Sequence, residues 1–173
     1  MNSLVFTIIG DDRQGVVEQI ANVVNDHEAN WLGSRMSQLG GKFAGMIEVA
    51  GDESQLASLS HALESLEGLR VVVETGAGEK TKASESTAVV TILGLDRPGI
   101  VREVSIALRS ASLNVLELTT GVSQAAMTGG LMFNGRALVD TANGNMAELA
   151  QKLEEASLEL GVDIEIEIVE PDD

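Results

Sequence analysis

The chain has 173 residues, of which 44% are hydrophobic and 22% charged, and its formal net charge is −16. This is a globular rather than a disordered composition; no apolar run approaches the roughly 20 residues that span a bilayer, and the negative charge argues against direct binding to nucleic acid or to an anionic membrane. The absence of cysteine excludes disulfides and thiolate chemistry and fits a reducing compartment, so we expect a cytoplasmic protein without a signal peptide.

Hydrophobic patterning predicts six elements in the first half of the chain. A glutamine three residues after Asp52 is typical of a helix start. In chain order we expect a strand at 4–9, a polar turn at 10–15, a helix from Val16, strands at 30–39 and 43–50 joined by Gly40-Gly41, a helix from Asp52 and a strand from Leu69.

The second half predicts the same order of elements. Asn145 followed by Glu148 is again a typical helix start. The expected elements are a strand at 87–93, a helix at 98–110, strands at 114–123 and 131–139, a helix from Asn145 and a strand at 162–169.

The two halves are also similar in sequence, at an offset of 84 residues. Segment 5–17 aligns with 89–101, and Asn30 aligns with Asn114. A repeat of this length is the size of a small domain, not of a solenoid repeat, so we interpret the chain as a duplicated domain.

The order β-α-β-β-α-β in each unit is the ferredoxin-like pattern of the α+β class. We therefore expect two units, each with a four-stranded antiparallel sheet and two helices on one face. The boundaries predicted are 1–75 for the first unit, 76–86 for a linker and 87–170 for the second unit. The linker has no hydrophobic periodicity and a flexible composition.

The turn after the first strand of each unit carries the motif Gly-x-Asp-Arg-x-Gly. A helix N-terminus with a small residue nearby can hold a carboxylate, an aspartate can accept from an ammonium group, and an asparagine amide offers a donor and an acceptor. Such groups complement a free amino acid. The candidate ligand-binding residues are Gly10, Asp11, Asp12, Arg13, Gly15 and Asn30 in the first unit, and Gly94, Asp96, Arg97, Pro98, Gly99 and Asn114 in the second.

A purely structural interpretation of the motif stays open. An aspartate near a helix start is commonly a cap, and Pro98 suits the first helical position. The two arginines can lie in solvent or pair with a nearby acid, and the two asparagines can satisfy backbone groups at a strand start. No paired general acid and base is evident, and His27 and His61 lack metal-ligand spacing, so we expect no enzyme, no metal and no cofactor.

The sequence Asp-Arg-Pro-Gly-Ile-Val at 96–101, with Asn114 farther along, resembles the signature of the ACT domain family. Segment 12–17 with Asn30 is a variant of the same signature, so the resemblance covers nearly the whole chain. It implies βαββαβ modules that pair side by side or across their sheets and bind amino acids at interfaces near this turn. Exposed sheet edges also invite pairing, so we expect a homodimer with an amino-acid ligand, of which glycine is one candidate.

A tandem of two such units without an effector domain, together with segment 34–45, resembles the glycine cleavage system transcriptional repressor group. That resemblance implies contact with a DNA-binding activator protein rather than with DNA, in agreement with the acidic charge. A regulatory subunit of an amino-acid metabolic enzyme, or an assembly module with empty sites, remains an alternative.

Two positions of the motif depart from the ACT pattern. Asp12 and Asp96 stand where amino-acid-binding members often have asparagine, which favours an ammonium group or marks a cap without a ligand. Gly10 and Gly94 stand where some serine-binding members have histidine, so serine recognition in that mode is not expected.

Overall fold

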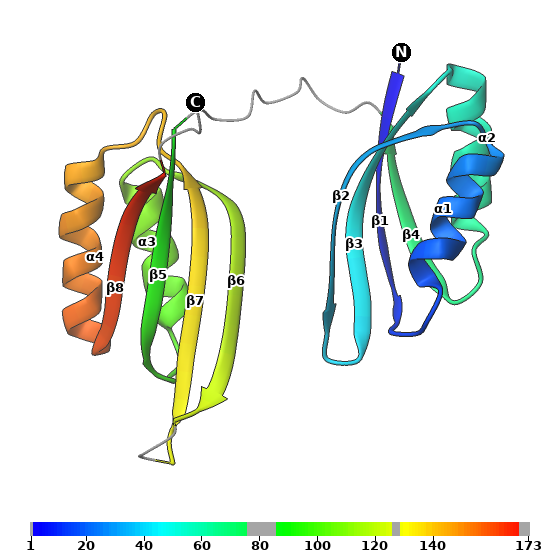
Figure 1. Cartoon of the computed structure of the whole chain (residues 1–173). Helices are drawn as coiled ribbons and strands as arrows, with labels where there is room; N and C mark the ends of the chain where they lie inside the picture. The colour runs from blue at the N-terminus through cyan, green and yellow to red at the C-terminus, as the bar shows by residue number, and fades with distance from the viewer. Residues whose placement is uncertain (1, 76–85, 126–128, 170–173) are drawn as a thin grey trace. The chain divides into compact units, whose positions relative to one another are not determined.

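The computed structural model describes residues 2–75, 86–125 and 129–169, and the chain divides into two compact units, 1–80 and 81–173. The predicted linker falls almost entirely on residues 76–85, which lie outside the described residues. The first unit contains β1 (Asn2–Asp11), α1 (Val16–Asp26), β2 (Asn30–Leu39), β3 (Lys42–Gly51), α2 (Glu53–Glu64) and β4 (Leu69–Thr75) (Figure 1). The second contains β5 (Thr87–Leu95), α3 (Ile100–Ser110), β6 (Asn114–Gln124), β7 (Leu131–Asp140), α4 (Met146–Leu160) and β8 (Val162–Val169).

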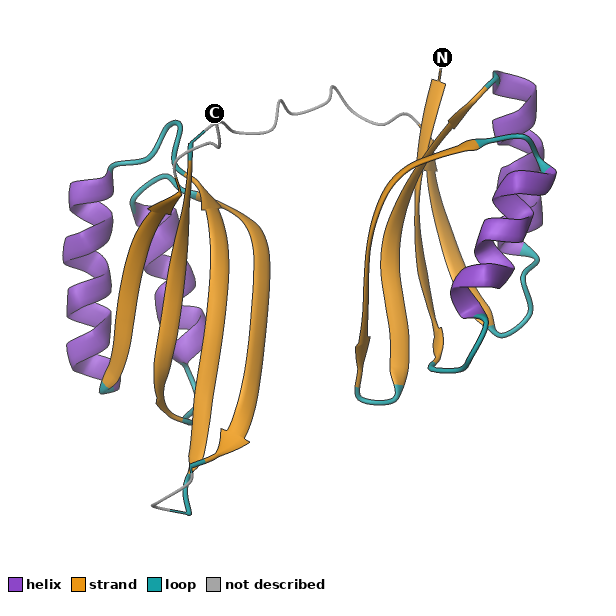
Figure 2. Ribbon diagram, viewed as in Figure 1, coloured by secondary structure: helices purple, strands orange, loops and turns teal. Residues whose placement is uncertain are grey.

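Each unit is a single antiparallel sheet with its two helices on one face (Figure 2). The strand order is β2-β3-β1-β4 in the first unit and β6-β7-β5-β8 in the second. The predicted fold class, two βαββαβ units of the ferredoxin-like type, is therefore confirmed.

The core of each unit lies between the sheet and its helices. On β1, the alternate residues Leu4, Phe6 and Ile8 are at most 2% exposed, so the sheet's helix-facing side is fully covered. The other buried apolar residues of this core are Val16, Ile20, Val24, Ile47, Val49, Leu56, Leu59, Leu63 and Leu69. The second unit has a separate core of the same design, centred on Val90, Ile92, Leu149 and Leu153.

Several predicted boundaries were wrong, and two of them have a clear physical cause. β1 does not end before Gly10, because antiparallel pairing with β3 continues through Gly10 and Asp11. α3 does not begin at Pro98 but at Ile100. The cause is Gly99, which has a positive φ of 104°. A residue with this φ cannot belong to the first turn of a right-handed helix, where φ is near about −60°.

Candidate functional site

The motif glycines at the helix starts act through their backbone conformation. Gly15 and Gly99 are the N-cap residues of α1 and α3, with φ of 85° and 104°. A Cβ on either residue would have no atom within 4 Å, so the requirement is for a positive φ, which glycine adopts at little cost. Neither helix has a side-chain cap, so the interpretation of Asp12 and Asp96 as helix caps was wrong.

The earlier motif glycines, in contrast, make room for the sheet. A Cβ on Gly10 would lie 2.5 Å from the carbonyl oxygen of Gly68, and one on Gly94 would lie 2.6 Å from Cγ1 of Val162. Both positions face the first residues of the neighbouring edge strand, β4 or β8. The need for glycine at both positions thus arises from close strand packing.

Asp12 and Asp96 form hydrogen bonds through their backbone N–H groups only. The N–H of Asp12 donates to the carbonyl of Gly41 (3.0 Å), and the N–H of Asp96 donates to that of Leu131 (2.8 Å). These bonds hold each turn against a neighbouring strand hairpin. Both side chains are exposed, and within the described part of the chain neither carboxylate has a hydrogen-bond or ion-pair partner.

The motif arginines reach toward the end of the second helix of their own unit. Nη2 of Arg97 donates to the carbonyl of Glu159 at 2.5 Å. Arg13 donates to the side chain of Gln19 and lies near Gly68, whose Cβ position is 3.6 Å from Nη2. Arg97 therefore connects the turn to the end of α4, where carbonyl groups carry partial negative charge, whereas Arg13 connects the turn to Gln19 of α1 beside the loop that follows α2. The sequence alone gave no signal for these partners.

Asp11 forms an ion pair with Lys42, its cross-strand neighbour on β3. The hydrogen bond and the charge of Lys42 lower the pKa of the Asp11 carboxyl below its ordinary value. The corresponding pair in the second unit is Leu95 and Met132, which cannot form an ion pair. This ion pair therefore belongs to the first unit alone.

The structure does not bring Asn30 to the turn of its own unit. Asn30 lies opposite Ala50, and Ala50 lies opposite Ser3 at the beginning of β1. The strand from Ser3 to Asp11 spans roughly 26 Å at about 3.3 Å per residue, so the asparagine and the turn occupy opposite ends of the sheet (Figure 1).

The second unit shows the same separation. Asn114 lies opposite Asp140, which pairs with Thr87 at the start of β5, while the turn follows the other end of that strand. In both units the turn and the asparagine therefore lie at opposite ends of the sheet, because α1 and α3 return the chain to the end where β1 and β5 begin.

Other candidate chemistry is sparse in the described part of the chain. No group of three or more histidine, aspartate or glutamate side chains there could hold a metal ion. The ring of His27 bonds to the carbonyl of Val23 through Nδ1 at 2.8 Å, a local helix contact. Among the described residues, no helix has the length and apolar character to cross a bilayer.

Comparison with known proteins gives a consistent result. The family model of the ACT domain matches residues 2–73 and 86–167. The UPF0237 protein MK1213 of Methanopyrus kandleri is 34% identical over 79 residues, which cover 44% of this chain and 81% of that protein. The crystal structure of an unknown protein from Galdieria sulphuraria superimposes with a TM-score of 0.80 at 27% identity, over 97% of this chain and 98% of that one.

A further crystal structure, of a candidate glycine cleavage system transcriptional repressor, superimposes with a TM-score of 0.73 at 17% identity, over 98% of both chains. This likeness is one of fold. ACT domains are typical of regulators that bind small amino-acid ligands and are not themselves catalytic, and the family model matches both units. The chain therefore belongs to the ACT domain family.

Proposed function

We propose that the protein is an amino-acid-responsive regulator that controls expression of the glycine cleavage system by contacting a DNA-binding activator protein in the cytoplasm. The observation that carries the sensing part is the pair Asp12 and Asp96. Both carboxylates are exposed, stand at the same position of the two units and have no partner among the described residues. Since neither caps its helix, both are available to an external group.

The ligand that best fits this turn is a zwitterion. The carboxylate of Asp12 or Asp96 can accept a hydrogen bond from an ammonium group. The first-turn N–H groups of α1 and α3 lack a side-chain cap and can donate to a carboxylate. A small amino acid such as glycine carries both groups on one carbon atom, so one molecule can contact the aspartate and the helix N-terminus together.

Asn30 and Asn114 do not reach the turn of their own unit, so we propose that they contribute to such a site from a second copy of the chain. Because each asparagine lies at the far end of its sheet from the turn, a second copy with antiparallel strands would bring its asparagine end to the turn of the first. The proposal therefore includes a homodimer, with a ligand contacted by the turn of one copy and the asparagine of the other.

The net charge of the chain supports regulation through contact with a protein partner rather than through contact with DNA. A net charge of −16 opposes binding to the phosphate backbone, which requires clustered basic residues. The structural similarity to the candidate repressor supports an effect on transcription. Capture of the activator from a lysate would support this output, whereas capture of an amino-acid metabolic enzyme would favour a role as its regulatory subunit.

Thermal unfolding with a panel of amino acids, led by glycine and serine, tests the sensing part. A ligand at about 100 times its Kd adds about 2.7 kcal/mol to the free energy of unfolding, which the wild type should show for selected amino acids only. The double variant Asp12→Ala/Asp96→Ala should lose this response.

The matched control is Asp26→Ala/Asp163→Ala, which removes one exposed aspartate from each unit and changes the charge equally. It should respond like the wild type. A panel without any selective shift, or a response that survives in Asp12→Ala/Asp96→Ala, contradicts the proposal.

A further inference from the structure

The helix layer of the second unit leaves the edge strand β6 uncovered. Val115, Leu118 and Val122 lie on the face of β6 that points toward the helices, since each pairs with a buried residue of β7. They are nevertheless 39%, 46% and 52% exposed, because neither α3 nor α4 lies over this strand (Figure 2). On the side of α3, Val101 is exposed as well. We call the apolar channel between these four residues the β6 groove.

A small hollow lies at the bottom of the β6 groove. Its volume is about 20 Å³, which is enough for one water-sized group. Because the lining is almost entirely apolar, the hollow suits the end of an aliphatic side chain better than a water molecule. The residues that line it include Val104, Ser105, Leu108, Val115, Leu118 and Thr120.

The first unit closes the same groove with its own side chains. Trp31 and Met36 occupy the positions of Val115 and Thr120 in the strand pairing, and both pack against the core of the first unit. The position of Leu118 is taken there by a serine. The two repeats therefore share the fold but not the groove, which is open and apolar in the second unit.

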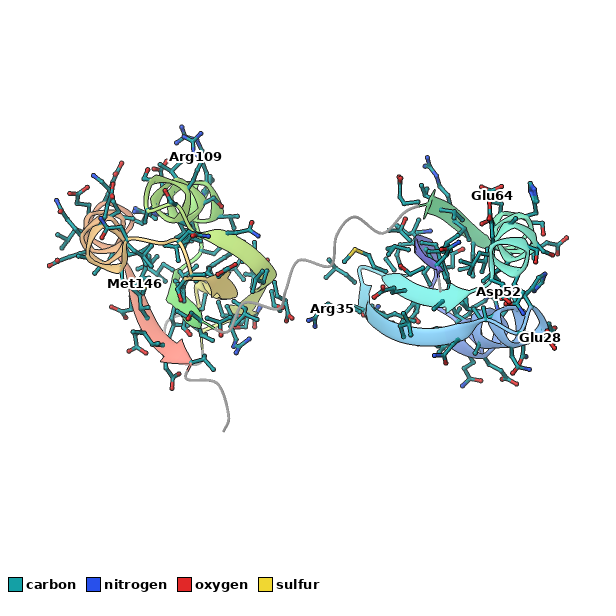
Figure 3. The ribbon with its side chains drawn as sticks, turned by 90° about the horizontal axis from the view of Figure 1, so that it is seen from above. Glu28, Arg35, Asp52, Glu64, Arg109 and Met146 are labelled. Carbon is teal, nitrogen blue, oxygen red and sulfur yellow. The ribbon has the colours of Figure 1, made fainter. Side chains whose placement is uncertain are left out.

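The α3 side of the β6 groove carries positive charge. Arg102 and Arg109 lie three residues before and four residues after Ser105, so both are its neighbours on the helix surface. Figure 3 shows Arg109 projecting from α3 away from the sheet, and within the described residues it has no hydrogen-bond or ion-pair partner. The first unit has Glu18 and Asn25 at the two arginine positions. In an acidic chain, this rim is locally basic.

We propose that the β6 groove binds an amphipathic helix of a partner protein. An aliphatic side chain of that helix fills the hollow, and acidic residues on its flank lie beside Arg102 and Arg109. Apolar anchors at helical spacing are the usual way in which a groove recognises a helix, and opposite charges along the rim fix its orientation.

A helix covers this surface, whereas a strand does not. A strand added to the edge of β6 would extend the sheet and leave the helix-side face of β6 exposed. A helix beside α3 would complete the helix layer, at the usual separation of about 8–10 Å between packed helices. The groove from Val115 to Val122 is about 23 Å long at ~3.3 Å per residue, which matches a helix of about 15 residues.

Binding in the β6 groove deepens the proposed function, and it rests on that function in one respect, the existence of a protein partner. The groove does not include Asp96 or the carboxylate site proposed at the turn. Response to amino acids and binding of a helix can therefore be present or absent independently, and each has its own measurement.

Two synthetic peptides of about 15 residues probe the groove. Both carry leucine on one helical face, and the flank carries glutamate in one and lysine in the other. In NMR titrations of the full chain without amino acids, the glutamate peptide should shift the amide signals of α3 and β6. The lysine peptide should bind there at least about tenfold more weakly, although the net charge of −16 attracts it to the rest of the surface.

Substitutions taken from the first unit test the apolar part of the groove. Val115→Trp/Thr120→Met should raise the Kd of the glutamate peptide at least about tenfold, because these residues cover the groove in the first unit. Leu118→Ser should have a similar effect. Its matched control is Leu93→Ser, which removes an equally exposed leucine, 48% against 46%, from the opposite face of the same sheet and should leave the Kd unchanged.

A second matched pair tests the charged rim. Arg109→Asn should raise the Kd of the glutamate peptide about threefold or more, since one attractive charge is lost. Arg136→Asn changes the net charge equally, but Arg136 pairs with Thr91 and Thr119 on the sheet face that points away from the helices. This variant should bind the peptide like the wild type. Circular dichroism checks that every variant is folded.

Several results would overturn the assignment of the groove. They are the absence of shifts in α3 and β6, tighter binding of the lysine peptide at these elements, and equal effects of Leu118→Ser and Leu93→Ser. Protection of β6 amides on peptide binding would indicate an added strand, and dissociation of a dimer by Leu118→Ser in sedimentation equilibrium would indicate a second copy. These results leave the amino-acid panel and capture of the activator untouched, so failure of the groove and failure of the proposed function are distinguishable.

Discussion

Arg97 and the carbonyl group of Glu159 join the start of α3 to the end of α4 through a hydrogen bond of 2.5 Å. The two residues are 62 positions apart in the sequence, so the bond is a tertiary contact within the second unit. Arg13 serves the first unit similarly through Gln19 and the loop at Gly68. The arginine of the motif is therefore explained by folding, whereas the aspartate beside it is not.

Replacing Arg97 with alanine should destabilise the protein by about 1 kcal/mol, because a charged donor is lost from the negative end of a helix. Urea unfolding measures this change. Arg102→Ala is the control: Arg102 bonds to its neighbour Glu103 on the helix surface, and its loss should cost less than about 0.5 kcal/mol. Equal costs for both variants would contradict the role assigned to Arg97.

Gly15→Ala and Gly99→Ala should each cost about 1 kcal/mol in the free energy of unfolding, since the added Cβ is strained at positive φ although space is open. Gly33→Ala provides the comparison. Its Cβ site is equally open but its φ is not in the left-handed range, so denaturant unfolding should show little change. A neutral Gly99→Ala variant would mean that the turn tolerates another conformation.

Gly94→Ala should cost about 1–3 kcal/mol through overpacking, because the new Cβ would lie 2.9 Å from Cα of Val162 as well as close to its side chain. Adding Val162→Ala should recover only part of this loss, since the backbone contact remains. A double-mutant cycle of unfolding free energies, measured without any ligand, separates the cost of the side-chain contact from that of the backbone contact. Full stability of the single variant, with loss of amino-acid binding only, would instead assign Gly94 to the ligand.

Lys42→Met should raise the pKa of the Asp11 carboxyl, because the hydrogen bond and charge of Lys42 hold it below its ordinary value of 3.8. In the wild type, the stabilising contribution of this pair is present above that ordinary value and is lost as the pH falls through the lowered pKa. NMR titration of the Asp11 carboxyl in both proteins checks the direction. An unchanged midpoint in Lys42→Met would show that the pair does not persist in solution.

Much of the fold followed from local patterns in the sequence. Alternation of Leu4, Phe6 and Ile8 predicted a strand with one buried face, and the positions of these residues in the core confirm it. The ends of β1 and α3 were missed because they depend on strand pairing and on the φ of Gly99, neither of which hydrophobic periodicity reports.

The candidate site was predicted less completely. The motif correctly located a turn followed by a helix. Spacing along the chain did not indicate that Asn30 lies at the other end of the sheet. The βαββαβ order itself requires this, because the first helix returns the chain to the end where β1 starts. The partners of Arg13 and Arg97 depend on tertiary contacts and could not be predicted.

The sequence by itself determined the duplication, the order of the elements and the place of the Gly-x-Asp-Arg-x-Gly turn in each repeat. Hydrophobic periodicity and glycine spacing are local properties, so they can be read without the tertiary structure. Tertiary structure decided which groups are left without a structural role. Asp12 and Asp96 remain without partners in the described residues, and Asn30 lies at the end of the sheet opposite the turn. These properties depend on which residues become cross-strand neighbours, and that is fixed by register rather than by position in the chain.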